Sequence, residues 1–366
     1  MSDNLVFVGT YTENTGSVKE KSGGIYVYQM NPADGALSLV YKTKGVINPS
    51  FLALHPCGRF LYAVNEVGQL DGQPGGGVSA FSVNPRSGEL ALLNQQLSRG
   101  ADPCHLSVDA TGTVVLAANY SGGNLTILPI DPVGRLCPAS QVIQHLGSSL
   151  DPLRQEGPHV HSVTLDPANR FAIVADLGLD KLMLYRLDLA EKGLIPHGHP
   201  EVKVQAGAGP RHLDFHPSGR FIYLINELDS TLTAFAYDPD EGVLREIQAI
   251  STLPEGFHGT NWPADVHVSP SGKFVYGSNR LHDSIVIFAV DEESGCLTFV
   301  GHEPTGGKYP RNFAIDPAGT FLLAANQHSG TLVTFRMDAQ TGKLTPTGQV
   351  VQVPTPVCVK IVCATS

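Results

Sequence analysis

The sequence has few charged residues and no local concentration of positive charge. Of its 366 residues, 16% are Asp, Glu, Lys or Arg, and 34 acidic residues outnumber 24 basic ones, so the formal net charge is −10. Nucleic acids and anionic membranes bind positively charged surfaces, so neither is an expected partner. The ordinary apolar content, 42%, excludes a disordered chain, and the shortage of Glu, Lys and Ala excludes a coiled coil.

Long apolar runs and paired cysteines are also missing. No stretch approaches the roughly 20 apolar residues of a membrane-spanning helix, and Met1 to Val8 lacks the basic start of a signal peptide. The six cysteines are scattered without a CxxC pair, as in a protein whose thiols stay reduced. We therefore expect a soluble cytoplasmic protein.

Motifs of several enzyme classes are absent. The sequence contains no GxSxG elbow, no P-loop and no dinucleotide-binding fingerprint, which argues against serine hydrolases, NTPases and dehydrogenases. His159 and His161 form an HxH pair, but no third zinc ligand has a recognisable spacing. Neither a metal nor a cofactor is therefore expected.

Gly and Pro, in contrast, are abundant, with 39 and 26 residues, and they punctuate a repeat. One phrase occurs six times: an apolar strand, a Pro/Gly turn and a second apolar strand, as in PSFLALHPCGRFLYAVN. An Asn or Asp stands sixteen positions after the first residue of each copy, namely Asn65, Asn119, Asp176, Asn226, Asn279 and Asn326. A second phrase occurs seven times and has a turn that begins with Asn or Asp and ends with Gly, where Gly accepts a positive φ.

The two phrases together predict a closed ring of seven four-stranded units. The missing seventh copy of the first phrase falls where the chain begins and ends, because residues 356–363 resemble an inner strand and residues 5–11 a second strand. We predict an all-β, seven-bladed β-propeller forming a single domain over residues 1–366, closed by pairing of the N- and C-terminal strands. Two stacked β-sandwiches would not repeat one spacing six times.

The lengths of the connections predict which face carries function. On one face the turns are short and alike, whereas long segments fall on the other: Tyr11 to Gly24, Glu66 to Gly77, Gln144 to Gly157 and Ser251 to Trp262. Insertions concentrate on the binding face of repeat proteins. These segments consist largely of Gly, Gln, Asp and Ser, with Phe257 and Trp262 as exceptions, so they do not resemble an apolar protein-binding surface.

Positions that all units share are attributed to the fold, and positions that differ are candidates for function. The Asn/Asp ring is shared, so we interpret it as structural hydrogen bonding; a calcium site there is disfavoured because acidic residues are not enriched. The residues just after this ring, and those just after the start of each inner strand, differ between units. They bring a group of basic and acidic residues to the channel mouth: His161, Arg211, Glu227, Arg280 and Arg311.

Converging arginines favour a phosphate or carboxylate ligand, unless they form salt bridges with neighbouring aspartates. His161 and Glu227 are both candidates for moving a proton. Glu66 occupies the same position in its unit as Glu227 but is expected to lie across the ring from the arginines, which makes it the weaker candidate.

Several phrases resemble the lactonase-type seven-bladed propellers, a family that includes bacterial 6-phosphogluconolactonases and fungal carboxymuconate lactonizing enzymes. They include FVGTYT, HVHSVTLDP, GPRHLDFHPSGRFIYLINELDSTL and SNRLHDSIVIFAVD, and together they span most of the chain. The resemblance implies a metal-independent active site in the channel mouth. Its catalytic residues would be His161 of HVHSV, Arg211 of GPRH, Glu227 of INEL and Arg280 of SNR.

The expected function is hydrolysis of a small anionic lactone, 6-phospho-D-glucono-1,5-lactone, in the pentose phosphate pathway. His161 or Glu227 would activate water, while Arg211 and Arg280 would stabilise the oxyanion. Four residues are expected to bind substrate, with the first holding the phosphate: Arg311, His105, His212 and Asn312. The protein is expected to be a monomer or a weak homodimer. Two alternatives stay open: a carboxymuconate-type lactonizing enzyme, and a non-enzymatic propeller that binds a protein through its loops.

Overall fold

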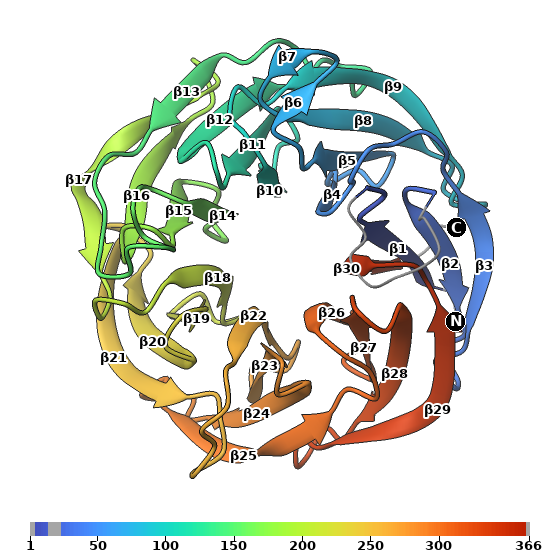
Figure 1. Cartoon of the computed structure of the whole chain (residues 1–366), viewed down its shortest axis with the longest axis vertical. Coiled ribbons are helices and arrows are strands. Elements are labelled where there is room, and N and C mark those ends of the chain that lie inside the picture. Colours follow the sequence, from blue (N-terminus) through green and yellow to red (C-terminus); the bar gives the residue numbers. More distant parts are fainter. Residues whose placement is uncertain (1–3, 14–22, 364–366) are drawn as a thin grey trace.

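The structure is a computed structural model that describes residues 4–13 and 23–363. In these ranges the regular elements are β-strands, and seven four-stranded antiparallel sheets stand around a central channel (Figure 1). This arrangement confirms the predicted seven-bladed propeller. None of the described residues forms a helix long and apolar enough to cross a membrane.

Each blade contributes one strand to each of four concentric positions. The inner strands, which line the channel, are β4 (Leu52–Leu54), β10 (Pro103–Val108), β14 (Val160–Leu165), β18 (Pro210–Phe215), β22 (Trp262–Val268), β26 (Pro310–Ile315) and β30 (Pro356–Cys363). The second strands are β5 (Phe60–Asn65), β11 (Val114–Asn119), β15 (Phe171–Asp176), β19 (Phe221–Asn226), β23 (Phe274–Arg280), β27 (Phe321–Asn326) and β1 (Asn4–Thr10).

The two outer positions follow the same order around the ring. The third strands are β8 (Gly77–Val83), β12 (Asn124–Pro129), β16 (Lys181–Asp188), β20 (Thr231–Asp238), β24 (Ser284–Val290), β28 (Thr331–Met337) and β2 (Tyr26–Met30). The outermost are β9 (Leu90–Leu97), β13 (Gln141–Gln144), β17 (Gly193–Lys203), β21 (Val243–Ser251), β25 (Leu297–Pro304), β29 (Leu344–Gln352) and β3 (Leu37–Lys42). A small hairpin, β6 (Gln69–Leu70) and β7 (Gln73–Pro74), is inserted after β5.

The two ends of the chain close the ring. β30 pairs antiparallel with β1, from Asn4 opposite Cys363 to Thr10 opposite Pro356, so that one sheet has the order β3-β2-β1-β30. The sequence prediction of the seam is confirmed. β1 consequently has a partner on both sides, which removes an exposed strand edge.

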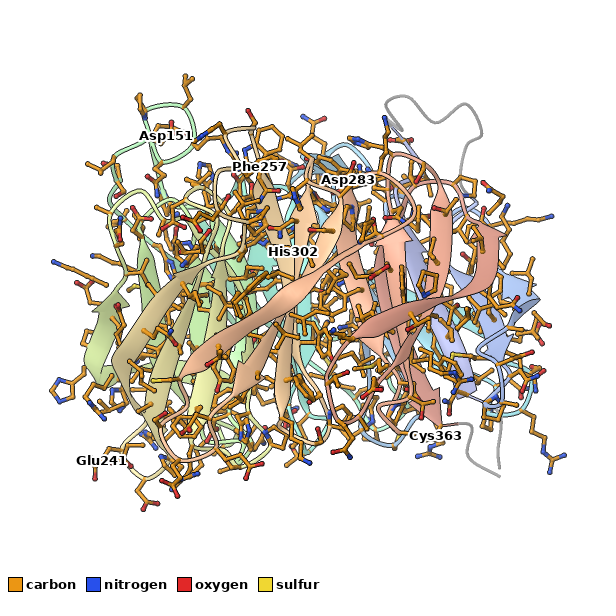
Figure 2. The ribbon with its side chains drawn as sticks, turned by 90° about the horizontal axis from the view of Figure 1, so that it is seen from below. Asp151, Glu241, Phe257, Asp283, His302 and Cys363 are labelled. Atoms are coloured by element: carbon orange, nitrogen blue, oxygen red, sulfur yellow. The ribbon has the colours of Figure 1, made fainter. Side chains whose placement is uncertain are left out.

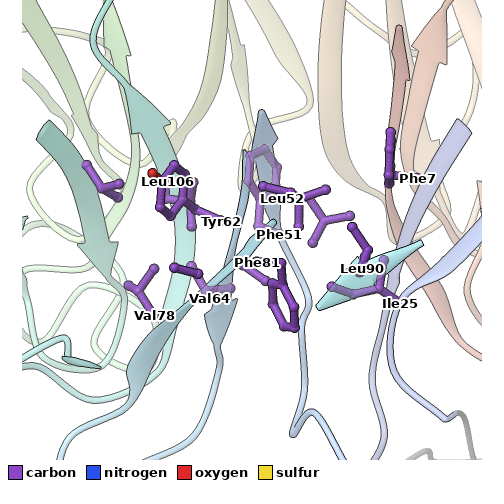
Figure 3. Close-up of a cluster of buried hydrophobic side chains, with 14 of the residues drawn as sticks. Phe7, Ile25, Phe51, Leu52, Tyr62, Val64, Val78, Phe81, Leu90 and Leu106 are labelled. Carbon is purple, nitrogen blue, oxygen red and sulfur yellow. The ribbon is translucent and has the colours of Figure 1, made fainter. Parts of the chain in front are cut away.

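The core lies between the blades. Side chains alternate along a strand, so each buried strand packs against both neighbouring sheets. In β15, Ala172 and Val174 face one apolar cluster, while Ile173 and Ala175 face the next. Figure 3 shows the cluster in which the blade of β4, β5, β8 and β9 packs against the blades on either side, including Phe7 from β1 and Phe81 from β8.

The predicted Asx–Gly turns join the third and fourth strands of every blade. In six of them the Gly has a φ between 66° and 83°, as expected. The exception is the turn Asp188 to Gly193, where Lys192 takes the left-handed conformation with a φ of 50°. The extra residue in this turn moves the positive φ one position earlier than predicted.

The Asn/Asp ring makes structural hydrogen bonds, as predicted. Asn65 donates to the Ile47 carbonyl oxygen (2.8 Å), and Asn119 donates to the Ser98 carbonyl oxygen (3.2 Å). Each bond ties the end of a second strand to the segment that enters its own blade. The ring therefore holds the strand ends in place around the channel mouth.

The long and short connections lie on opposite faces. Figure 2 shows Asp151, Phe257 and Asp283 near one face and Glu241 near the other. The first three belong to connections between blades or between second and third strands, and Glu241 belongs to a turn between third and fourth strands. Most of the predicted long segment Tyr11 to Gly24 lies outside the described residues. We call the long-loop face the upper face.

Candidate active site

An irregularity at the start of the inner strands places side chains in the channel. In five of these strands the pairing with the second strand skips one residue directly after the first, so that this residue bulges out of the ladder. The bulged residues are Cys104, His161, Arg211, Arg311 and Val357. β-Bulges re-aim side chains in this way, and here three of the predicted site residues are bulged.

Three of the bulged residues, Cys104, His161 and Arg311, lie with the ends of second strands around a cavity of about 240 Å³ at the upper mouth of the channel. We call it the upper pocket. Its lining consists of Glu66, Cys104, Tyr120, Arg154, His161, Glu227, Trp262, Arg280, Tyr309 and Arg311. Four of the predicted functional residues therefore meet there, since His161, Glu227, Arg280 and Arg311 all belong to the lining.

Glu227 is the centre of the charge arrangement. Its Oε2 lies 2.8 Å from Arg211 Nε and 2.6 Å from Arg280 Nη2, while its Oε1 accepts a hydrogen bond of 2.6 Å from Arg154. Burial alone would raise the pKa of this carboxyl, but the charges of Arg280 and Arg211 outweigh burial and hold the pKa well below its usual range. Glu227 is thus a fixed anion and a weak proton acceptor.

His161 faces the same carboxylate from the other side. Its side chain is buried, with Nε2 4.0 Å from Glu227 Oε2, and its ring meets the Tyr120 ring edge-on. Burial and the charge of Arg211 lower the pKa of His161 well below its ordinary value. The imidazole is therefore neutral at physiological pH, which leaves a nitrogen lone pair able to accept a proton.

Arg311 lies apart from the group around Glu227. Its guanidinium stands over the Tyr11 ring, 5.6 Å from the ring centre, and makes no ion pair within 4 Å among the described residues.

Glu66 also lines the pocket, but its carboxylate is hydrogen-bonded to other side chains. It accepts hydrogen bonds from the Tyr11 hydroxyl (2.8 Å) and the Ser50 hydroxyl. The expectation that Glu66 lies away from the arginines is wrong, since the channel mouth is narrow enough for both to line one cavity.

Three lining residues lie outside the positions that the sequence analysis compared. Trp262 and Tyr309 stand directly before the repeated phrase, which starts at Pro263 and Pro310, so the internal alignment extended by one residue would have found them. Arg154 had no such signal, because it comes from the loop Gln144 to Gly157, which has no counterpart in the other blades. That loop is anchored by the fully buried Gln155, whose amide donates to the Leu177 carbonyl oxygen at 2.8 Å.

Three predicted substrate-binding residues lie deeper in the channel. His105, His212 and Asn312 are buried, and none belongs to the lining of the upper pocket. His105 and His212 instead line a second cavity of about 370 Å³ that opens toward the short-turn face, and we call it the lower cavity. Arg211 is also outside the lining, buried beneath Glu227. Direct contact of these four residues with a ligand stays a prediction.

The charge of the upper pocket is opposite to that of the whole protein. Its lining contains the guanidinium groups of Arg154, Arg280 and Arg311 and two carboxylates, and the buried Arg211 contacts one of these carboxylates. Together these groups have a formal charge of +2, in a chain whose net charge is −10. The alternative that the arginines form salt bridges holds for three of the four, but their partner is Glu227 rather than an aspartate. Among the described residues no cluster of His, Cys, Asp and Glu is arranged to hold a metal ion.

The loop that carries Arg154 is less polar than the sequence analysis stated. Leu146, Leu150 and Leu153 are 83%, 69% and 85% exposed, so Phe257 and Trp262 are not the only large apolar residues of the long segments. The upper face thus presents more apolar surface to a protein partner than the polar residues of its loops indicated.

Known proteins resemble this chain over nearly its whole length. The profile of the family described as lactonase, seven-bladed β-propeller matches residues 5–361. The chain is 38% identical over 309 residues to the 6-phosphogluconolactonase of Bacillus subtilis, covering 84% of each chain. It is 37% identical over 308 residues to the 6-phosphogluconolactonase of Formosa agariphila, covering 83% of this chain and 84% of that protein.

A solved structure agrees with these sequence relatives. The periplasmic gluconolactonase of Pseudomonas aeruginosa superposes with a TM-score of 0.92 at 36% identity, with 100% of both chains covered. The sequence identity, the coverage and the propeller architecture all point to one group of proteins. The chain belongs to the lactonase family of seven-bladed β-propellers.

Proposed function

We propose that this protein is a lactone hydrolase that converts 6-phospho-D-glucono-1,5-lactone to 6-phosphogluconate. Two relatives that cover more than four fifths of the chain are 6-phosphogluconolactonases. The observation that carries the proposal is the composition of the upper pocket: a neutral histidine lies beside a glutamate that is paired with arginines, and a further arginine, Arg311, makes no ion pair among the described residues. The histidine suits water activation at the lactone carbonyl, and Arg311 suits a phosphate.

His161 is the proposed general base. Sequence reasoning left the choice between His161 and Glu227 open, but a carboxylate that already accepts three guanidinium groups is a poor proton acceptor. A water oxygen would bond to the lactone carbonyl carbon while its proton passes to a nitrogen of His161. When the bond from this carbon to the ring oxygen breaks, the imidazolium would return a proton to the ring oxygen.

Arginines above Glu227 would stabilise the oxyanion that forms on the carbonyl oxygen. Arg280 and Arg154 both line the pocket, whereas Arg211 reaches it only through Glu227. We assign oxyanion contact to Arg280 and Arg154 and a supporting role to Arg211, which modifies the prediction that Arg211 touches the oxyanion. Loss of one such donor commonly costs about 3 kcal/mol of transition-state stabilisation.

Arg311 would bind the phosphate. It is the pocket arginine without an ion-pair partner among the described residues, so its charge is available to a ligand. A phosphate at Arg311 and a lactone ring near His161 would place the two ends of the substrate on opposite sides of one small cavity. Charge-assisted contacts to phosphate are among the stronger hydrogen bonds in proteins.

The metabolic setting follows from this reaction. We place the protein in the pentose phosphate pathway and in the cytoplasm; the location is supported by six cysteines that are all free thiols. We expect it to act as a monomer or a weak homodimer on a small anionic lactone, without nucleic acid or membrane.

A direct assay tests the proposal. The purified protein is mixed with freshly prepared 6-phosphogluconolactone, and the release of acid is followed at pH 6.5 against the spontaneous rate. Unphosphorylated glucono-1,5-lactone and a carboxymuconate, followed by its dienoate absorbance, are the comparison substrates. The proposal requires the highest kcat/KM with the phosphorylated lactone. It is wrong if that lactone is hydrolysed no faster than in buffer, and turnover of carboxymuconate would instead support a lactonizing enzyme.

A further inference from the structure

The channel beneath the upper pocket contains a hydrogen-bonded chain that ends on Glu227. Asp265, on β22, is buried and accepts a hydrogen bond of 2.8 Å at Oδ1 from His212 Nδ1. His212 Nε2 lies 3.3 Å from Arg211 Nη1, and Arg211 Nε donates to Glu227 Oε2 at 2.8 Å. The chain therefore runs from one blade's inner strand to the Glu227 carboxylate through two consecutive residues of the preceding blade.

The second oxygen of Asp265 is surrounded by donors. Oδ2 lies 3.0 Å from His267 Nε2, 2.5 Å from Asn312 Nδ2 and 3.4 Å from the Phe313 backbone nitrogen. The Asn312 amide is fixed in orientation, because its Oδ1 accepts a hydrogen bond from the Val359 backbone nitrogen at 2.6 Å and a reversed amide would lose this bond. Asn312 Nδ2 therefore faces Asp265, and the atom at the Oδ2 position must be a hydrogen-bond acceptor.

The protonation of His212 follows from its two neighbours. Burial and the charge of Arg211 lower the pKa of His212 to about 4, so the ring is neutral and carries one proton. The carboxylate of Asp265 requires that proton on Nδ1, which leaves Nε2 as an acceptor for Arg211 Nη1. In the other tautomer, Nε2–H would point at a guanidinium N–H, and two donors would face each other at 3.3 Å.

The fold itself does not require a carboxylate at this position. The corresponding residues of the other six inner strands are uncharged or a neutral histidine: Phe51, His105, Ser162, His212, Asn312 and Cys358. Each of these blades forms the same four-stranded sheet. Because only one blade has a carboxylate here, Asp265 is better explained by its contacts than by the fold. Its hydrogen bond with His212 connects it to Arg211.

We propose that Asp265 is a positioning residue that holds His212 in the Nδ1–H tautomer and thereby fixes Arg211 against Glu227. This inference rests on the proposed function for its effect on turnover. Asp265 touches no substrate, because it lies below the upper pocket and lines only the lower cavity. Its effect is transmitted by His212, whose acceptor nitrogen keeps the guanidinium in the orientation that Glu227 needs.

The isosteric variant Asp265→Asn gives the sharpest test. The amide oxygen must occupy the site of Oδ2, where three donors converge, so the NH2 group faces His212 and forces the tautomer with Nε2–H. We expect kcat to fall roughly 10- to 100-fold, because a small displacement of a group that supports the site can cost about two orders of magnitude. KM for the phosphorylated lactone should change less than threefold, since Arg311 is not part of the chain.

Asp214→Asn is the matched control. Asp214 lines the same lower cavity and lies near His267, but it does not contact His212. Asp214→Asn should leave kcat within twofold of the wild-type value. Thermal unfolding of both variants shows whether either change acts through stability alone.

Two further measurements separate positioning from a general structural role. In an Arg211→Ala background, Asp265→Asn should lower kcat less than threefold further, because its effect passes through Arg211. Nitrogen-15 NMR of the imidazoles should show His212 protonated at Nδ1 in the wild type and at Nε2 in Asp265→Asn. Full additivity with Arg211→Ala, or an Nε2–H tautomer in the wild type, would overturn the inference. The NMR result does not depend on substrate, so it stands even if the protein fails to hydrolyse the lactone.

Discussion

His161 is the residue on which the proposed chemistry most directly depends. Replacement by glutamine keeps much of its volume but removes the proton acceptor, and general-base catalysis is typically worth about 10²- to 10⁴-fold. We expect His161→Gln to lower kcat within this range while KM changes little. His159→Gln is the matched control, because His159 stacks on Tyr120 at 4.5 Å yet does not line the pocket. Equal losses of kcat in both variants would show that His161 is not the general base.

The pH dependence of turnover follows from the lowered pKa of His161. A base is active when unprotonated, so a pKa below the ordinary value moves the acidic limb of activity to lower pH. At saturating substrate we expect kcat to be constant through pH 6.5 and to decline only at more acidic pH. The profile is measured from pH 4.5 to 7.5, with spontaneous hydrolysis subtracted. A midpoint at or above pH 6.5 would show that a different group acts as the base.

Arg311 should decide the preference for a phosphorylated substrate. Charge-assisted hydrogen bonds contribute about 1.5–3 kcal/mol, so Arg311→Gln should raise KM for the phosphorylated lactone roughly 10- to 100-fold. The unphosphorylated lactone should be affected less than threefold. Arg336→Gln, which alters an outward arginine on β28, is the control and should leave both values unchanged. If both lactones weaken equally with Arg311→Gln, the phosphate lies elsewhere.

At the scale of the secondary-structure element, the position of the loop that carries Arg154 depends on one glycine. A Cβ at Gly178, in the turn between β15 and β16, would lie 1.9 Å from the Gly157 carbonyl oxygen and 2.8 Å from the His159 nitrogen. The end of the Gln144 to Gly157 loop would have to move. We expect Gly178→Ala to lower the free energy of unfolding by about 1–3 kcal/mol and to reduce kcat by displacing Arg154.

Gly157→Ala provides the control for this loop, because a Cβ there meets no atom within 4 Å. It should fold and turn over like the wild type. Denaturant unfolding and steady-state kinetics of the two variants test the pair. Wild-type kinetics in Gly178→Ala would mean that the position of Arg154 does not depend on this turn.

At the scale of the whole molecule, we expect the ring to be stable only when its seam is closed by the pairing of β30 with β1. Deletion of residues 354–366 removes β30 and leaves β1 with an unpaired edge along the strand. It also removes Val357, Cys358 and Val359 from the buried core. We expect the truncated chain to lose cooperative unfolding and to aggregate in size-exclusion chromatography, because exposed strand edges pair with other chains.

Thr355→Val is the control for the seam. It removes the hydrogen bond of 2.6 Å from the Thr355 hydroxyl to the Tyr11 carbonyl oxygen but keeps β30. Thr355→Val should lower the free energy of unfolding by about 1 kcal/mol, and the variant should elute like the wild type and unfold cooperatively. A truncated chain that elutes without aggregates and unfolds at the wild-type temperature would show that the six other blades suffice.

The amino-acid sequence by itself determined the repeating parts of this protein. The sixteen-residue spacing and the Asx–Gly turns specify strands and reversals locally, so the seven blades, the seam and the upper face could all be predicted. The same register isolated His161, Glu227, Arg280 and Arg311 as residues of the channel mouth, and the upper pocket contains all four. Such features depend on backbone geometry that is the same in every repeat.

Only the tertiary structure decided which side chains meet across the channel. It brought three arginines onto Glu227, placed Glu66 in the same pocket as Arg311, and set His105 and His212 below rather than beside them. It also delivered Arg154 from a loop that no other blade repeats. These contacts depend on the diameter of the ring and on the path of a unique loop, and neither is encoded in the spacing of a repeat.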